Sequence, residues 1–148
     1  MVRVLLVALL TGQAPAIQSA PDVTACVVAN LPAEVDASAG LDVVRRLFLL
    51  RDRFWPSGAA AHPVNLPASS KLREGFTYEM FGQSVKDQAA YWNERYFHGT
   101  RPPPTVASEE AVLLFVARTP GALGYVQESA TAELPEGVRR LMCLTSSP

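Results

Sequence analysis

The stretch His62-Pro63-Val64-Asn65-Leu66-Pro67-Ala68-Ser69-Ser70-Lys71-Leu72-Arg73-Glu74-Gly75-Phe76 decides the fold. It predicts a short strand over residues 63–66, a polar turn, and a helix that opens at Ser69 or Ser70. A strand that enters a helix through a serine-rich turn leaves backbone N–H groups uncovered at the start of the helix, where an anion can bind. The alternative is that Ser70 only caps its own helix, as serine commonly does.

A second helix is predicted to follow the first one closely. In the first helix, Leu72, Phe76 and Met80 fall four residues apart and form one apolar stripe, which Gly82 terminates. Ser84 begins the second helix as a capping residue. The predicted apolar stripe of the second helix is Val85, Ala89, Trp92 and Tyr96. The aromatic residues of the second helix are Tyr91, Trp92, Tyr96 and Phe97. Helical spacing predicts that they pack in the core instead of forming a carbohydrate platform.

The remaining segments complete an α/β pattern. Residues 24–29 form an almost wholly apolar run rich in β-branched side chains, which predicts a central strand buried on both faces. Helices are predicted over residues 41–51 and 108–118, and further strands over residues 122–126 and 138–144. This order of elements predicts the α/β class, with a mixed sheet flanked by helices.

The N-terminus predicts export. Arg3 precedes the apolar run of residues 4–10, and small residues follow it. A charged start, a short apolar core and an A-x-A-like site are typical of a secretory signal peptide, and the run is too short to span a bilayer of about 30 Å. We expect residues 1–20 to be the signal peptide, with cleavage after Ala16 or Ala20, and residues 21–148 to be one periplasmic or secreted domain. An unusual first strand or a lipid-facing anchor is the alternative.

Length and charge limit the possible partners. Without the leader, about 130 residues remain, which is enough for one domain and one core. The chain carries 13 basic and 14 acidic residues, and its net charge falls from −1 to −2 once Arg3 leaves with the leader. There is no basic field, so nucleic acid is not an expected partner. No apolar run after the leader is long enough to span a membrane.

Cys26 and Cys143 are the two cysteines of the chain. Export to an oxidising compartment makes a Cys26–Cys143 disulfide plausible, provided that the two residues lie on adjacent strands. Two buried free thiols, which behave as small apolar side chains, are the alternative. We expect neither arrangement to be catalytic, because no histidine that would activate a thiol lies close by in the sequence.

The sequence carries no signal for an enzyme. His62 and His98 have no ligand-type spacing, and there is no H-x-x-x-H or C-x-x-C motif, so neither a metal site nor another cofactor is expected. The G-x-S-x-G motif of serine hydrolases is absent. The pair Glu109-Glu110 suits a helix N-terminus better than acid–base catalysis.

Several short motifs follow one another along the chain in a recognisable order. They are Val27-Val28-Ala29-Asn30, Leu47-Phe48-Leu49, Trp55-Pro56-Ser57-Gly58, residues 63–67, Ser70 with Leu72-Arg73 and Phe76, Tyr91-Trp92 with Phe97 and Gly99, Pro102-Pro103, and Val116-Ala117-Arg118-Thr119-Pro120-Gly121-Ala122-Leu123-Gly124-Tyr125-Val126. Together with the signal peptide, this set resembles the phosphate-binding, periplasmic solute-binding proteins of ABC transporters. The last block is its most specific part.

The resemblance implies one lobe of a type II periplasmic-binding-protein fold, whereas full members of the family clamp an anion between two lobes. One of the family's anion sites has an arginine after a strand and a Ser-Gly-Thr turn at a helix start. Here Asn65 stands where that arginine is expected, and Ala68-Ser69-Ser70 replaces the turn. By this resemblance Ser69 and Ser70 carry over as hydroxyl donors, and Lys71 or Arg73 substitutes for the missing charge.

The sequence therefore predicts an exported, non-enzymatic binding domain. Its predicted ligand is inorganic phosphate or another oxyanion, held weakly because the charge-assisted arginine contact is missing. The candidate anion-binding residues are Asn65, Ser69, Ser70, Lys71 and Arg73. The alternative is a protein-interaction or dimerisation module that has lost solute binding, in which the open face of the lobe meets a protein partner or a second copy.

Overall fold

The structure is a computed structural model, and it describes residues 12, 14, 23–32 and 39–145. In chain order the elements are β1 (Ala25–Asn30), α1 (Leu41–Phe48), β2 (His62–Pro63), α2 (Lys71–Phe81), α3 (Val85–Phe97), α4 (Glu109–Arg118), β3 (Ala122–Gln127), the 3-10 helix η1 (Glu128–Thr131) and β4 (Val138–Leu144). The predicted order of strands and helices is confirmed, with η1 added. The predicted signal peptide lies outside the described residues, apart from Gly12 and Ala14.

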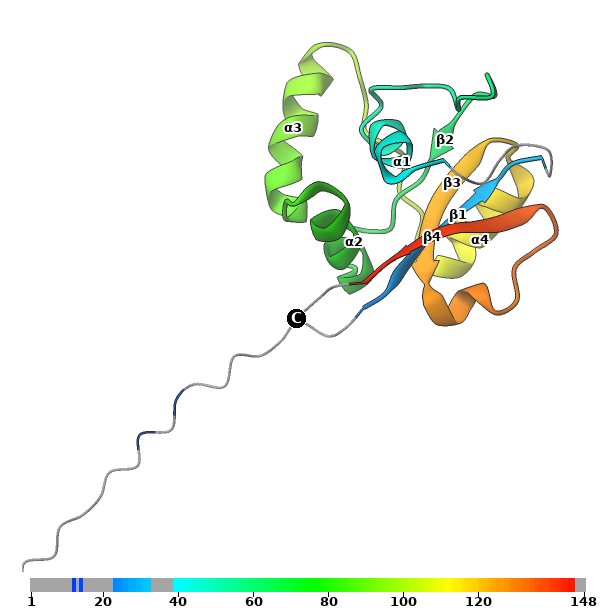
Figure 1. The fold of residues 1–148 in the computed structure, drawn as a ribbon. Helices are drawn as coiled ribbons and strands as arrows, with labels where there is room; N and C mark the ends of the chain where they lie inside the picture. Colours follow the sequence, from blue (N-terminus) through cyan, green and yellow to red (C-terminus); the bar gives the residue numbers. More distant parts are fainter. Residues whose placement is uncertain (1–11, 13, 15–22, 33–38, 146–148) are drawn as a thin grey trace, which may run out of the picture.

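The four strands form one mixed sheet in the order β2-β3-β1-β4 (Figure 1). β1 pairs antiparallel with both β3 and β4, and β2 pairs parallel with β3. β1 lies inside the sheet and five of its six residues are buried, as predicted for a central strand. The predicted fold class, α/β with a mixed sheet flanked by helices, is thus confirmed.

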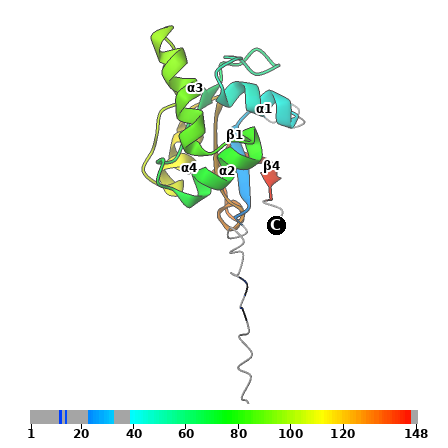
Figure 2. The same cartoon turned by 90° about the vertical axis from the view of Figure 1, so that its left-hand side faces the viewer.

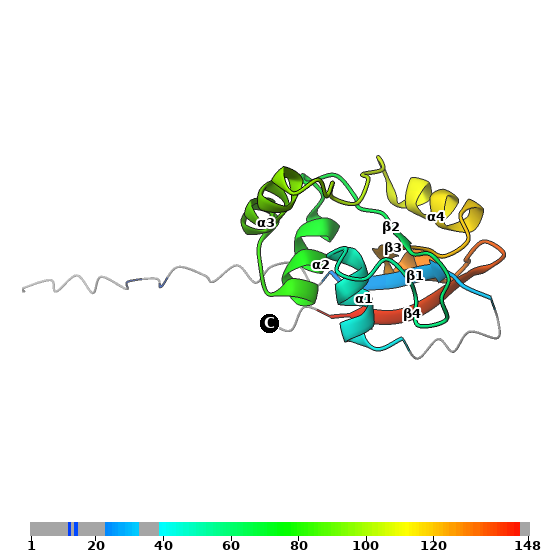
Figure 3. The same ribbon diagram turned by 90° about the horizontal axis from the view of Figure 1, so that it is seen from above.

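Helices cover both faces of the sheet (Figure 3). Neighbouring residues of β3 show this, because side chains alternate between the faces of a strand. Gly124 faces α4, where an added Cβ would lie 2.6 Å from Val112 Cγ1. Tyr125 points to the opposite face, where its ring lies against Phe48 of α1 and Phe76 of α2. Glycine at position 124 therefore lets α4 approach the sheet closely.

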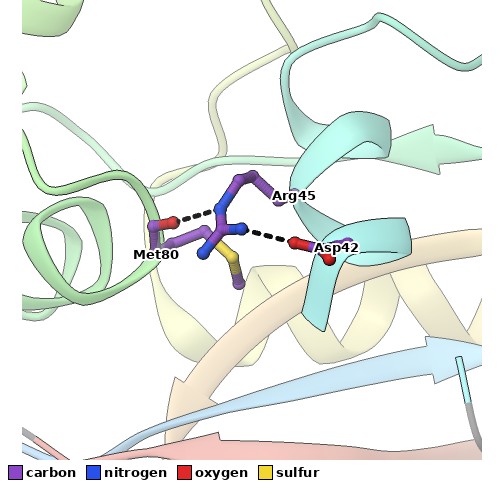
Figure 4. Close-up of polar contacts among 3 residues, drawn as sticks. All are labelled: Asp42, Arg45 and Met80. Carbon is purple, nitrogen blue, oxygen red and sulfur yellow. Dashed lines mark hydrogen bonds and ion pairs between the residues drawn. The ribbon is translucent and has the colours of Figure 1, made fainter. Parts of the chain in front are cut away.

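An ion-paired arginine connects α1 to the far end of α2. Arg45 Nε donates to the carbonyl oxygen of Met80 at 2.7 Å, and Arg45 Nη1 pairs with Asp42 at 2.6 Å (Figure 4). A cation at the C-terminal end of a helix satisfies a free carbonyl and opposes the negative end of the helix dipole. The C-terminal end of α2 is thereby held against α1.

The structure joins Cys26 and Cys143 by a disulfide. The two residues are directly opposite each other in the antiparallel pair of β1 and β4. β4 is an edge strand, so the bond attaches this edge to the central strand. None of the described helices has the length and apolar character needed to cross a membrane.

Three sequence predictions were wrong in detail. The helix expected over residues 41–51 ends at Phe48, and Leu50 beyond it has a positive φ of 52°. The strand expected over residues 63–66 is only two residues long, because Asn65 leaves β3 and bridges to Thr105 instead. The apolar stripe expected on α3 was wrong in part, because Trp92 is the one of its four residues that is buried. Gln88 and Trp92 are buried, whereas Ala89, Tyr96 and Phe97 are exposed. The face that a helix buries depends on its neighbours, and α3 projects away from the sheet, so aromatic spacing alone misplaced the buried face (Figure 2).

We expect the disulfide to make a large contribution to stability. It closes a loop across a sequence separation of 117 residues, and the chain-entropy model gives about 4 kcal/mol for a loop of this size. Urea unfolding of the oxidised chain should therefore show a higher midpoint than unfolding of the reduced chain, and the Cys26→Ala/Cys143→Ala variant should match the reduced chain. Equal midpoints with and without reductant would contradict this expectation.

Candidate functional site

The N-terminus of α2 begins at a serine cap. Ser70 has an extended backbone, and its Oγ accepts a hydrogen bond from the Arg73 amide at 3.2 Å. The first helical hydrogen bond runs from the Glu74 amide to the Ser70 carbonyl oxygen at 3.1 Å. The prediction of a helix that opens at Ser70 is confirmed. The amides of Lys71 and Leu72 precede the first helical bond and are therefore free of helical partners.

A buried tyrosine holds the turn before α2 in place. The Tyr125 hydroxyl donates to Asn65 Oδ1 at 3.0 Å and accepts from the Leu66 amide at 3.3 Å. Its ring stacks on Phe76, with centroids 3.8 Å apart and planes 9° from parallel. Burial raises the pKa of Tyr125 well above its usual range, so the hydroxyl stays protonated and can donate. The phenol thus links the sheet to the turn and to α2.

Two of the predicted site residues serve this framework. The Asn65 side chain is bound to Tyr125, and only 8% of the residue is exposed. The backbone of Asn65 is paired with the proline-rich segment, through Pro104 and Val106. Arg73 Nη1 donates to the Leu66 carbonyl oxygen at 2.7 Å. The structure therefore places the Asn65 and Arg73 side chains beneath the turn and not in the open depression beside it.

That depression lies between the starts of α2 and α4 and has a volume of about 350 Å³. It is lined by Leu66, Pro67, Ser69, Ser70, Ala107, Ser108, Glu109 and Glu110. The structure thus brings Ser69 and Ser70 together there, and Lys71 follows them as an exposed side chain. We name this hollow the two-helix depression, because the N-terminal ends of two helices meet in it.

The chemistry of the two-helix depression is mixed. Ser70 and Ser108 each use an oxygen lone pair to cap a helix, so the hydroxyl hydrogen of each is free to donate. The positive ends of both helix dipoles also favour an anion. The negative charges of Glu109 and Glu110 oppose the binding of an anion. Both carboxylate oxygens of Glu109 accept hydrogen bonds from Gln127, one from its backbone amide at 2.6 Å and one from its Nε2 at 3.2 Å. Glu109 keeps its negative charge, because hydrogen bonds from neutral amides do not cancel it, so the depression combines hydroxyl and amide donors with two carboxylates.

Sequence reasoning did not place Ser108, Glu109 and Glu110 at this site. It treated them only as the start of a helix, and that helix start is confirmed. The available signal was the recurrence of a serine cap at both Ser70 and Ser108. Only the tertiary structure shows that the two caps face one depression. Within the described residues, no group of three or more histidine, cysteine or acidic side chains could hold a metal ion.

Comparison with known proteins identifies the fold. No protein-family model matches the sequence, and a search of curated proteins found no match either. Among solved structures, the chain is similar to an ABC-type phosphate transport receptor from Vibrio cholerae (16% identity, TM-score 0.54) and to PstS from Borrelia burgdorferi (12%, 0.59). It is also similar to a protein from Clostridium perfringens described as a phosphate ABC transporter substrate-binding protein with bound phosphate (12%, 0.54).

The likeness extends over most of this chain but over less than half of each neighbour. The alignments cover 80% of this chain and 45%, 47% and 44% of the Vibrio, Borrelia and Clostridium proteins. At these identities the likeness is one of fold. The predicted resemblance to phosphate-binding proteins of ABC transporters is confirmed at that level.

Removing the Tyr125 hydroxyl should destabilise the protein. Tyr125→Phe leaves Asn65 Oδ1 and the Leu66 amide without their buried partner, which costs about 1–3 kcal/mol. The wild type should also lose stability as the pH rises above about 10, since the unfolded chain then releases a proton that the folded state retains, and Tyr125→Phe should lose less.

Denaturant unfolding at neutral and alkaline pH measures both effects. Tyr78→Phe is the matched control, because Tyr78 lies on α2 and is 63% exposed. An unfolding midpoint of Tyr125→Phe equal to that of Tyr78→Phe at both pH values would show that the buried hydroxyl does not support the turn.

Proposed function

We propose that this chain is an exported, non-enzymatic binding domain that holds phosphate or another inorganic oxyanion weakly in the two-helix depression. One observation carries the proposal: two serine-capped helices open into one depression, in a fold otherwise found in phosphate-transport binding proteins. The ligand is taken from those neighbours, one of which contains bound phosphate. Export is taken from the signal-peptide pattern of residues 1–20.

An oxyanion in the two-helix depression would meet several donors. On the α2 side, the hydroxyl groups of Ser69 and Ser70 line the depression. Lys71 follows Ser70 directly and would add its backbone amide and its exposed ammonium group at the edge. On the α4 side, the Ser108 hydroxyl faces the same space. Oxyanions commonly bind where backbone amides and short hydroxyl side chains meet at a helix N-terminus. Asn65 and Arg73 would contribute by holding the turn that presents these donors.

The same geometry explains why binding should be weak. The depression is open to solvent and contains no arginine, whose forked donors make the strongest contacts to phosphate. The Glu110 carboxylate is exposed at its edge and repels anions. The matched part of the chain spans less than half the length of each structural neighbour. We expect dissociation constants in the millimolar range.

Calorimetric titration with phosphate and sulfate tests the proposal. The sequence has two lysines, and replacing each in turn gives a test variant and a matched control. Lys71 is the first residue of α2 and Lys86 is the second residue of α3, and both helices have serine caps. Lys71→Gln should weaken phosphate binding about fivefold at low ionic strength, because an exposed cation beside the anion is lost. Lys86→Gln should bind phosphate as the wild type does, since α3 and its cap Ser84 contribute no residue to the described lining of the depression, whereas Lys71 directly follows the lining residue Ser70.

A charge change of the opposite sign gives an independent check. Glu110→Gln removes the repelling carboxylate and should strengthen phosphate binding severalfold. Absence of measurable heat with any oxyanion at millimolar concentration would rule out the proposed site. Equal losses for the Lys71→Gln and Lys86→Gln variants would place binding elsewhere. A protein partner or homodimer through the open face of the lobe stays a prediction from the sequence.

A further inference from the structure

One end of the molecule exposes an unusual pair of aromatic side chains. Helix α3 extends away from the sheet, and Tyr96 and Phe97 lie in its last turn (Figures 1 and 2). Tyr96 is 59% exposed and Phe97 is 86% exposed. Neither side chain supports the core, and an exposed phenyl ring at a projecting tip is unfavourable in water unless another surface covers it.

A third exposed aromatic residue lies at the same end. The segment after α1 is attached to α3, because Tyr91 Oη donates to the Leu49 carbonyl oxygen at 2.9 Å. Arg95 Nη2 donates to the next carbonyl oxygen, that of Leu50, at 3.4 Å. This segment carries Phe54, which is 61% exposed. In Figures 1 and 2, the C-terminal end of α3 and this segment both lie at the upper end of the molecule.

The charges at this end are mostly positive. Arg51, Arg53 and Arg101 are exposed, and none of them takes part in the ion pairs of the described residues. The nearby acidic residues are Asp52 and Glu94. The charge of Asp52 is balanced by an ion pair with Arg46 at 2.7 Å, so Glu94 carries the remaining negative charge. A chain with a net charge of −1 therefore carries three exposed arginines without an ion pair in the segments that also bear Phe54, Tyr96 and Phe97. We call this set the aromatic–basic end; it consists of Arg51, Arg53, Phe54, Tyr96, Phe97 and Arg101.

We propose that the aromatic–basic end docks on an anionic phospholipid surface. Guanidinium groups pair with lipid phosphates, and aromatic rings enter the boundary between headgroups and acyl chains. The complementarity of charge selects this partner: the end presents three exposed arginines without ion pairs together with three exposed aromatic rings, which suits a flat surface that is negative outside and apolar beneath. This peripheral contact needs no membrane-spanning helix, and the described helices include none.

Vesicle co-sedimentation of the full chain, recovered from the exported fraction of expressing cells, tests the inference. The chain should bind vesicles of phosphatidylcholine mixed with phosphatidylglycerol, should not bind phosphatidylcholine alone, and should be released by high salt, since salt screens exposed charges. Arg101→Gln should weaken binding about fivefold. Phe97→Ser should weaken it severalfold at unchanged thermal stability, because the ring makes little contact with the fold.

Two matched variants on α4 serve as controls. Leu114 is 50% exposed and Arg118 is exposed, and both lie on a different helix from the aromatic–basic end. Leu114→Ser and Arg118→Gln should bind the mixed vesicles as the wild type does. The inference would be overturned by failure to bind these vesicles or by equal binding of the Phe97→Ser and Leu114→Ser variants. Displacement by soluble polyglutamate at equal charge would also overturn it, because the end would then recognise acidic polymers in general.

Discussion

The position of the candidate site depends on the buried phenol of Tyr125. Its hydroxyl group binds both Asn65 and Leu66, the last residues before the turn, and its ring stacks on Phe76 within α2. One side chain of β3 thus fixes both sides of the turn relative to the sheet. At the other end of α2, Arg45 binds the Met80 carbonyl oxygen and holds the helix against α1. The start of α2 is therefore presented to solvent at a fixed place.

The elements that were predictable from sequence depend on local chemistry. Serine caps and the left-handed Gly82 mark helix ends whatever the surroundings, and β1 is apolar enough to be read as a central strand. The strand order and the buried face of α3 were not predictable in this way, because they depend on contacts between distant segments. Helical spacing alone would not predict that Gln88 is buried while Tyr96 is exposed.

The candidate site was predictable in part for the same reason. Ser69, Ser70 and Lys71 follow from the turn and the cap, so the sequence places them at the start of α2. The α4 side, with Ser108 and Glu110, joins them only through the fold. The resulting balance of hydroxyl and amide donors against carboxylates is the reason why we propose only weak oxyanion binding. The aligned region spans less than half of each neighbour, so the likeness concerns only that part of their fold.

The central claim is that an oxyanion binds where α2 and α4 begin. Two-dimensional amide NMR during a phosphate titration tests it most directly, since each backbone N–H reports its own surroundings. The account predicts that the largest shift changes fall at residues 69–72 and 108–110, with the rest of the chain nearly unchanged. Shift changes confined to another part of the molecule, or none at millimolar phosphate, would contradict it.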